Sequence, residues 1–212
     1  MMQQLILLGA PGSGKGTQAK KLVETLSYIH LSTGDLLRAE IAKKSDLGKR
    51  VTDIMNAGQL VDDSTVLELL KANCNLSSNR YIFDGFPRNI DQAIALDEMV
   101  LGDCDRLVLY FDLDLNVLLS RIVNRRSCTG CGEIYNLVTK APKIEGKCDL
   151  CGKQLEHRKD DSQEIVLERL EIYKTTIGPV LEYYEAQGKL VKLDASKSSV
   201  DIFNGLKQAL EK

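Results

Sequence analysis

Short apolar runs alternate with stretches of helical periodicity along this chain. The apolar runs cover residues 4–8, 29–31, 81–83, 107–111 and 190–193, and each predicts a strand. Helical periodicity predicts helices over residues 15–26, 36–44, 47–56, 64–72, 90–101, 115–124 and 199–210. A longer helix is predicted from near Asp161 toward Gly188, and we expect Pro179 to kink or interrupt it. The alternation predicts an α/β fold, with a parallel sheet covered by helices on both faces.

Two segments depart from this alternation. Residues 32–61 hold two predicted helices between the second and third strands, more than a simple crossover needs. Residues 127–157 are rich in Cys, Gly and Lys and lack long apolar runs. We interpret both as insertions, so that residues 1–31, 62–126 and 158–212 form one core.

Composition narrows the classes of function. The 212 residues are 43% hydrophobic and 27% charged, which is typical of a globular protein. The chain has 28 basic and 30 acidic residues, so no broad basic surface is expected for binding a nucleic acid or a membrane. The longest uninterrupted apolar stretch, residues 107–111, is too short for a membrane span or a signal peptide. We therefore expect a cytoplasmic protein.

A glycine-rich loop follows the first predicted strand. Residues 9–15 have the spacing G-x-x-x-x-G-K, and Thr17 stands one place later than in the usual ending. Such a loop turns backbone N–H groups toward phosphate oxygens, Lys15 reaches the β- and γ-phosphates, and Thr17 is placed to serve Mg2+. The alternative is an ordinary glycine-rich turn. The full spacing, the lysine and the strand-loop-helix context favour nucleoside triphosphate binding.

Four cysteines form the second distinctive pattern. Cys128, Cys131, Cys148 and Cys151 are spaced C-x2-C-x16-C-x2-C, which predicts two turns around one tetrahedral, structural Zn2+. The alternatives are free or disulfide-bonded thiols, and a zinc ribbon that binds nucleic acid. Acidic residues interrupt any basic face of this segment and argue against the ribbon. The other two cysteines, at positions 74 and 104, are predicted to be buried apolar thiols.

Four motifs in this order resemble the adenylate kinase family, in its long-lid, zinc-containing bacterial form. They are GAPGSGKGTQ at residues 9–18, LSTGDLLR at 31–38, FDGFPR at 83–88 followed by Gln92, and the cysteine segment with RKDD at 158–161. The resemblance implies a P-loop NTPase-type core, a helical monophosphate-binding insertion and a zinc lid. It also implies reversible transfer from MgATP to AMP, giving two ADP, with lid closure excluding water, and a monomeric enzyme.

The resemblance also implies roles for individual residues. The group that neutralises the transferred phosphoryl would be Lys15, Arg88, Arg125, Arg158 and Arg169. ATP would contact Gly12, Ser13, Gly14, Lys15, Gly16, Thr17, Arg121, Arg125, Ile134, Tyr135 and Lys197. AMP would contact Thr33, Arg38, Gln59, Leu60, Val61, Gly85, Phe86, Pro87, Arg88, Gln92, Arg158 and Arg169. Mg2+ would be held through water by Thr17 and Asp84, and Zn2+ by the four cysteines.

Several residues leave open questions at this stage. Asp62 stands where the family usually has Pro, and Asp62 and Asp63 can cap the next helix, so we expect altered hinge stiffness and unchanged chemistry. Asn124 stands where Gly is common in the family, at the hinge of the second insertion. Arg121 and Arg125 are four residues apart, which predicts one face of a helix. The acidic pair at positions 160 and 161 is expected to latch the lid or to cap the long helix.

Two rival functions remain. One is another nucleoside monophosphate kinase, for CMP, UMP or GMP, although Thr33 and Gln92 favour AMP. The other is a nucleotide-binding switch or zinc-ribbon adaptor without transfer activity. The cluster of arginines argues against a switch, because a protein that binds one triphosphate needs no second phosphate site.

Overall fold

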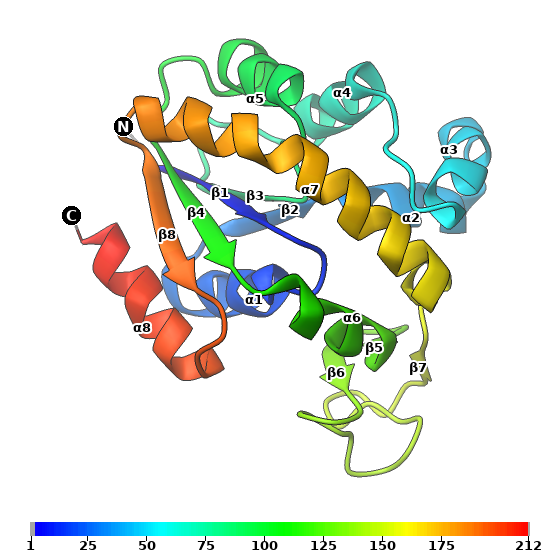
Figure 1. Cartoon of the computed structure of the whole chain (residues 1–212). Helices are drawn as coiled ribbons and strands as arrows, with labels where there is room; N and C mark the ends of the chain where they lie inside the picture. Colours follow the sequence, from blue (N-terminus) through cyan, green and yellow to red (C-terminus); the bar gives the residue numbers. More distant parts are fainter. Residues whose placement is uncertain (1–2, 212) are drawn as a thin grey trace.

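A computed structural model describes residues 3–211, and a parallel sheet forms its centre (Figure 1). Within these residues the sheet has five strands in the order β2-β3-β1-β4-β8. The strands are β1 (Gln4–Gly9), β2 (Ile29–Ser32), β3 (Tyr81–Asp84), β4 (Arg106–Asp112) and β8 (Leu190–Asp194). All five strands predicted from the apolar runs are present, each extended by one or two residues at most.

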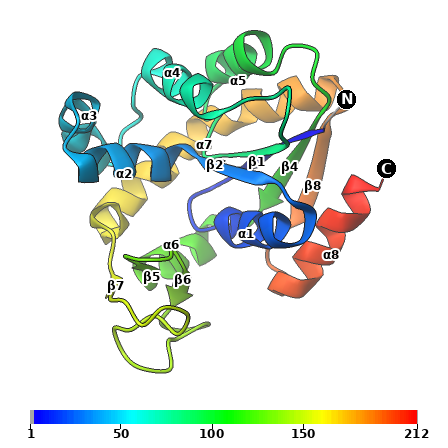
Figure 2. The same ribbon diagram turned by 180° about the vertical axis from the view of Figure 1, so that it is seen from behind.

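Helices cover both faces of this sheet, as predicted (Figures 1 and 2). One face carries α1 (Lys15–Leu26) and α8 (Ser199–Leu210), and the other carries α4 (Asp63–Asn73), α5 (Ile90–Leu96) and α7 (Gln163–Ala186). Side chains of β1 alternate between two cores: Leu5 and Leu7 pack with α1 and α8, and Ile6 and Leu8 pack with the helices opposite. These four leucine and isoleucine side chains are almost completely buried, because a central strand covered on both faces has no solvent side.

The first insertion contains α2 (Thr33–Lys43) and α3 (Asp46–Asn56), and α2 begins three residues earlier than its periodicity predicts. Ser32 is the N-cap of α2 and accepts a hydrogen bond from the Asp35 N–H, with 3.3 Å between N and Oγ. Asp62 caps α4 in the same way through the Thr65 N–H, at 2.9 Å. The residue that replaces the family's usual Pro therefore starts the next helix.

The helix predicted over residues 90–101 changes form at its midpoint. After α5 the chain widens into the π-helical turn η1 (Asp97–Leu101). Asp97 is buried there, and it accepts hydrogen bonds from the hydroxyl groups of Tyr183 and Tyr184 on α7. Apolar periodicity could not predict this turn, because the two tyrosines that donate to Asp97 lie more than eighty residues away in the sequence.

The second insertion follows α6 (Leu115–Val123) and contains a small antiparallel sheet in the order β6-β5-β7. Its strands are β5 (Arg125–Cys128), β6 (Ile134–Asn136) and β7 (Leu155–Glu156). We call residues 127–157 the cysteine segment. The prediction that Arg121 and Arg125 share one helix face is wrong, because α6 ends at Val123 and Arg125 pairs with Asn136 as the first residue of β5.

The long helix begins after the short turn η2 (Lys159–Asp161) and crosses the whole sheet. Its N-cap position is Ser162, so neither residue of the acidic pair caps it. Pro179 does not interrupt the helix, contrary to one of the two predicted outcomes. The missing N–H removes one hydrogen bond, whereas Val180 and Tyr184 just beyond it are completely buried against the sheet and hold the next turns in place. No helix between residues 3 and 211 has the length and apolar character that crossing a membrane requires.

Candidate active site and metal centre

A cavity of about 1060 Å³ opens where the strands of the parallel sheet end at their carboxyl side. Its walls come from the glycine-rich loop, both insertions, the loop after β3 and the start of α7. Every residue predicted to contact ATP, AMP or Mg2+ lines this cavity. Side chains from positions 12 to 197 of the sequence are therefore brought into one site.

The glycine-rich loop forms the floor of the cavity between β1 and α1. Gly12 and Gly14 have φ angles of +80° and +98°, which side chains with a Cβ rarely adopt. The Lys15 ammonium donates hydrogen bonds to the carbonyl oxygens of Gly9, at 2.8 Å, and Ala10, at 3.0 Å. Desolvation lowers the pKa of Lys15 to about 8, against the opposing effect of the nearby Asp84 carboxylate. The loop thus holds a cation whose charge an incoming anion would stabilise.

Asp84 ends β3 and faces the glycine-rich loop, as its position at the end of a buried strand predicts. One carboxylate oxygen lies 3.0 Å from His30 Nε2, on the adjacent strand β2. Burial raises the pKa of Asp84, but the hydrogen bond with His30 and the charge of Lys15 outweigh it, and the pKa lies below the usual range. Sequence analysis missed His30, because only the β2–β3 pairing brings the two side chains together.

Arginines and aspartates form a network across the cavity. Arg125 donates to both carboxylate oxygens of Asp161, at 2.8 and 2.5 Å, and Arg169 donates to Asp160 at 2.9 Å. The acidic pair left open by the sequence therefore serves as counter-ions to the arginines, and its carboxylates are not helix caps.

A third pair joins the same network from the first insertion. Arg38 donates to Asp35 at 2.5 Å, and Arg158 approaches the same carboxylate at 3.9 Å. Burial lowers the pKa values of Arg158 and Arg169 to about 10, and the nearby Arg125 adds to both shifts. The guanidinium groups of this network outnumber the carboxylates around them, which makes this end of the cavity a site for anions.

The loop after β3 forms the wall opposite the cysteine segment. Gly85 has a φ angle of +80°, and a Cβ there would come within 2.9 Å of the Thr33 hydroxyl oxygen. The Arg88 N–H donates to Gln92 Oε1 at 2.7 Å, and Gln92 Nε2 donates to Asp63 at 2.6 Å. The Gln92 amide, which the resemblance assigns to the AMP site, is thus fixed by protein partners and keeps one N–H group uncommitted.

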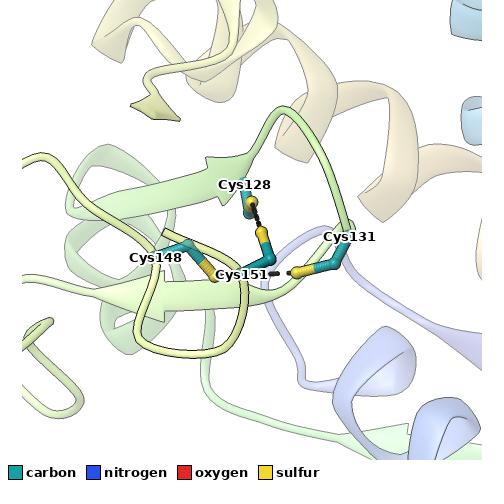
Figure 3. A group of neighbouring side chains, drawn as sticks. All are labelled: Cys128, Cys131, Cys148 and Cys151. Carbon is teal, nitrogen blue, oxygen red and sulfur yellow. Dashed lines mark hydrogen bonds between the residues drawn. The ribbon is translucent and has the colours of Figure 1, made fainter. Parts of the chain in front are cut away.

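The four cysteines of the second pattern converge as predicted (Figure 3). Their Sγ atoms all lie within 4.8 Å of one another, and Figure 3 shows the four side chains pointing together from two turns. None of the four forms a disulfide bond within residues 3–211, contrary to the disulfide alternative. The cluster can hold a metal ion, since four sulfur atoms at such distances match a tetrahedral site.

Tyr135 connects this cluster to the cavity that it lines. Its ring is buried in the cysteine segment, and its hydroxyl lies 3.5 Å from Cys148 Sγ and accepts a hydrogen bond from the Asp149 N–H. Burial raises the pKa of Cys148, but hydrogen bonds from Tyr135 and from backbone N–H groups lower it to about 6. Such a thiol readily becomes the thiolate that binds a metal.

The two remaining cysteines, at positions 74 and 104, are half-buried, so the prediction of burial was wrong in degree.

Comparison with known proteins agrees with this geometry. The family model described as adenylate kinase matches residues 7–189, from the first strand to the end of the long helix. The chain belongs to the adenylate kinase family. It is 43% identical over 210 residues to an adenylate kinase of Thermosipho africanus, covering 97% of both chains, and 42% identical over 214 residues to one of Thermodesulfovibrio yellowstonii, covering 99% of both. An adenylate kinase of Clostridium tetani is 41% identical, again over 97% of both chains.

The adenylate kinase match spans both insertions and all four motifs on which the resemblance rested. Three residues of this site were outside the sequence-based prediction: His30, Asp63 and the Asp35 carboxylate as a counter-ion. One signal in the sequence could have identified Asp35 as a counter-ion, because it lies one helical turn from Arg38. His30 and Asp63 carried none, because each meets its partner only through the packing of separate elements.

Proposed function

We propose that this chain catalyses the reversible transfer of the terminal phosphoryl group of ATP to AMP, giving two ADP. One observation carries the proposal: a single cavity is lined by two sets of cations from different elements, Lys15 of the glycine-rich loop and the arginines that include Arg38 and Arg88. Two sets of phosphate ligands suit two nucleotides facing each other. A switch that binds one triphosphate has no use for the second set.

The residues of the chain act by position and charge. In-line transfer between two bound nucleotides needs no covalent intermediate, so catalysis depends on orienting the two phosphates and stabilising charge on the transferred group. Lys15 and the guanidinium groups of Arg88, Arg125, Arg158 and Arg169 supply that charge from the walls of the cavity. Three of these arginines donate to a carboxylate or a carbonyl oxygen, and Arg158 lies beside a carboxylate. These contacts limit how far the guanidinium groups must reorganise when substrate binds.

Magnesium would enter with ATP. The residues present fit it, because the Asp84 carboxylate and the Thr17 hydroxyl are oxygen donors at the same edge of the loop. When bound, Mg2+ would neutralise negative charge on the β- and γ-phosphate oxygens. Asp84 and Thr17 would hold its water molecules. The lowered pKa of Asp84 keeps this carboxylate ionised for the role.

The cysteine segment acts as a lid with a structural Zn2+, and residues 32–61 act as the monophosphate-binding insertion. Thiolate ligands favour zinc, and four protein ligands leave no open position for catalysis. Closure of the lid would exclude water from the phosphoryl group. We further propose a cytoplasmic monomer whose partners are ATP, AMP and ADP, without nucleic acid or membrane ligands.

A substrate survey tests this proposal. Purified protein with MgATP is offered AMP, CMP, UMP and GMP in turn, and ADP formation is followed. We expect rapid turnover with AMP, because Thr33 and Gln92 lie beside its site, and much slower turnover with the others. Lys15→Met should abolish turnover, whereas Lys21→Met, on the same helix, should not. Absence of turnover with all four monophosphates would overturn the assignment.

A further inference from the structure

An ion pair joins the cysteine segment to the helix of the phosphate loop. Lys20 lies on α1, five residues after Lys15, and its ammonium bonds to one carboxylate oxygen of Glu133. The other oxygen of Glu133 binds the ammonium of Lys140, which belongs to the cysteine segment itself. Glu133 therefore divides its two oxygens between the core of the protein and its own segment.

This ion pair differs from the other links between the cysteine segment and the rest of the molecule. Among residues 3–211, the other hydrogen bonds that leave the segment go to residues 121, 124, 125, 126 and 158. These residues flank the segment on its two sides in the sequence. Those bonds can persist while the segment rotates about its ends. The Lys20–Glu133 pair spans the gap to α1 and must break when the segment moves away from it. In Figures 1 and 2 the segment lies below α1 and α6 at one end of the molecule.

The pair lies beside the nucleotide cavity and is partly shielded from water. The Glu133 side chain is 12% exposed and the Lys20 side chain 39% exposed. Lys20, Gly16 and Ile134 line the cavity, and Glu133 directly precedes Ile134 in the chain. Ile134 packs over Gly16, where an added Cβ would come within 3.6 Å of its Cδ1 atom. An ion pair beside an apolar contact is stronger than one in open water, because fewer water molecules screen it.

Lys140 makes the contact reversible. A buried carboxylate that loses its only cation pays a large desolvation cost, which would lock the segment in place. Glu133 keeps Lys140 as a partner after it leaves Lys20, so separation exposes one lysine and leaves no carboxylate unpaired. The arrangement suits a contact that forms and breaks in each catalytic cycle.

We propose that Lys20 and Glu133 form a latch that biases the cysteine segment toward α1, and so sets the affinity of the chain for the triphosphate. The pair positions Ile134 over the phosphate loop and takes no part in the chemistry. This inference rests on the proposed function where it concerns ATP. The pair itself consists of two side chains of this chain, so it can also be tested without ATP.

Two variants of the latch and two controls test the proposal. Lys20→Met and Glu133→Gln remove the attraction from either side, and the double variant measures whether the two act together. Lys21→Met removes a neighbouring charge of α1 that bonds to Ser199 instead. Lys140→Met removes the partner of Glu133 within its own segment. Metal content and melting temperature show which variants fold normally.

The first readout is kinetic. Lys20→Met and Glu133→Gln should each raise KM for ATP about three-fold at low salt, with KM for AMP and kcat not lowered. The double variant should match the single ones, and about 0.5 M KCl should remove the difference from the unmodified chain. Lys21→Met and Lys140→Met should not raise KM for ATP.

The second readout needs no activity. Amide hydrogen exchange in the nucleotide-free protein should be faster over residues 125–136 in both latch variants than in the unmodified chain. If no kinase activity is found but exchange responds, the proposed function fails and the latch stands. Unchanged exchange in Lys20→Met, a substitution outside the cysteine segment, overturns the latch, as does an equal effect of Lys21→Met. If Glu133→Gln loses metal, Lys20→Met alone decides.

Discussion

Arg125 and Asp161 face each other in a bidentate ion pair, with 2.8 Å from Nε to Oδ2 and 2.5 Å from Nη2 to Oδ1. Asp161 is completely buried, and Arg169 lies 3.5 Å from the same carboxylate. The pair joins the first residue of β5 to the turn before α7, which are the two connections of the cysteine segment. It therefore orients a guanidinium that we assign to phosphate, and it links the two connections of the cysteine segment.

Removing the Asp161 charge should destabilise the protein strongly. Asp161→Asn leaves Arg125 without its closest counter-ion in a buried site, and we expect a loss of about 3 kcal/mol in the free energy of unfolding. Urea denaturation followed by circular dichroism measures it. Asp46→Asn is the matched control, because its carboxylate is 98% exposed and Lys49 is its one ion-pair partner within residues 3–211, so the loss should stay below about 0.5 kcal/mol. Equal small losses in both variants would contradict the structural role given to Asp161.

Activity should depend on the ionisation of Lys15. Burial lowers its pKa from 10.5 to about 8, so the free enzyme loses the ammonium as the pH rises above that value. We expect kcat/KM for ATP to fall about ten-fold per pH unit above pH 8, because the phosphate then meets a neutral amine.

The same shift has the opposite sign for stability. The unfolded chain holds the Lys15 proton up to pH 10.5 and the folded chain releases it near pH 8. The contribution of this group to the free energy of unfolding therefore increases between those pH values. Lys15→Arg retains its charge throughout and should show neither trend, although its turnover is low. A flat pH profile of the unmodified chain up to pH 10 would contradict the assignment.

The cysteine cluster should contribute to stability more than to turnover. Cys148→Ser removes one of four metal ligands, and we expect lost metal content and a melting temperature lower by roughly 10 °C, with turnover at about 25 °C much less affected. Metal analysis and thermal denaturation measure the first two. Cys104→Ser, outside the cluster, should retain metal. A loss of turnover without a change in melting would argue against a purely structural metal.

The first insertion should depend on Gly48, where α2 and α3 come closest. A Cβ on Gly48 would lie 2.2 Å from the carbonyl oxygen of Glu40, a backbone atom that cannot move aside. We expect Gly48→Ala to cost about 2 kcal/mol and to raise KM for AMP more than KM for ATP, because α2 carries Thr33 and Arg38.

A second glycine provides the control for this prediction. Gly205 in α8 has space for a Cβ, at 3.6 Å from Leu193 Cδ2, so Gly205→Ala should stabilise the protein by about 0.5 kcal/mol. Chemical denaturation distinguishes the two signs. Stabilisation by both substitutions would show that helix propensity, and not the contact with Glu40, governs position 48.

Much of the site was predictable because its signals are local. The phosphate loop lies within seven residues, and each cysteine pair within four. Strand and helix periods need only the neighbouring residues, and they placed the α1 and α8 boundaries without error. Errors arose where a longer-range contact competed with a local pattern, as at Arg125, where strand pairing with Asn136 ended the helix.

The sequence by itself determined the layer architecture, the phosphate loop and the cysteine pattern of this protein, because hydrophobic periods and short motifs depend on neighbouring residues. Only the tertiary structure decided which charges meet. Asp161 pairs with Arg125 across 36 positions, His30 with Asp84 across 54, and Lys20 with Glu133 across 113. A charged side chain has no period that records its partner, because the pairing follows from the order of the strands and the paths of the two insertions. In isolation each of these residues could equally lie on a hydrated surface.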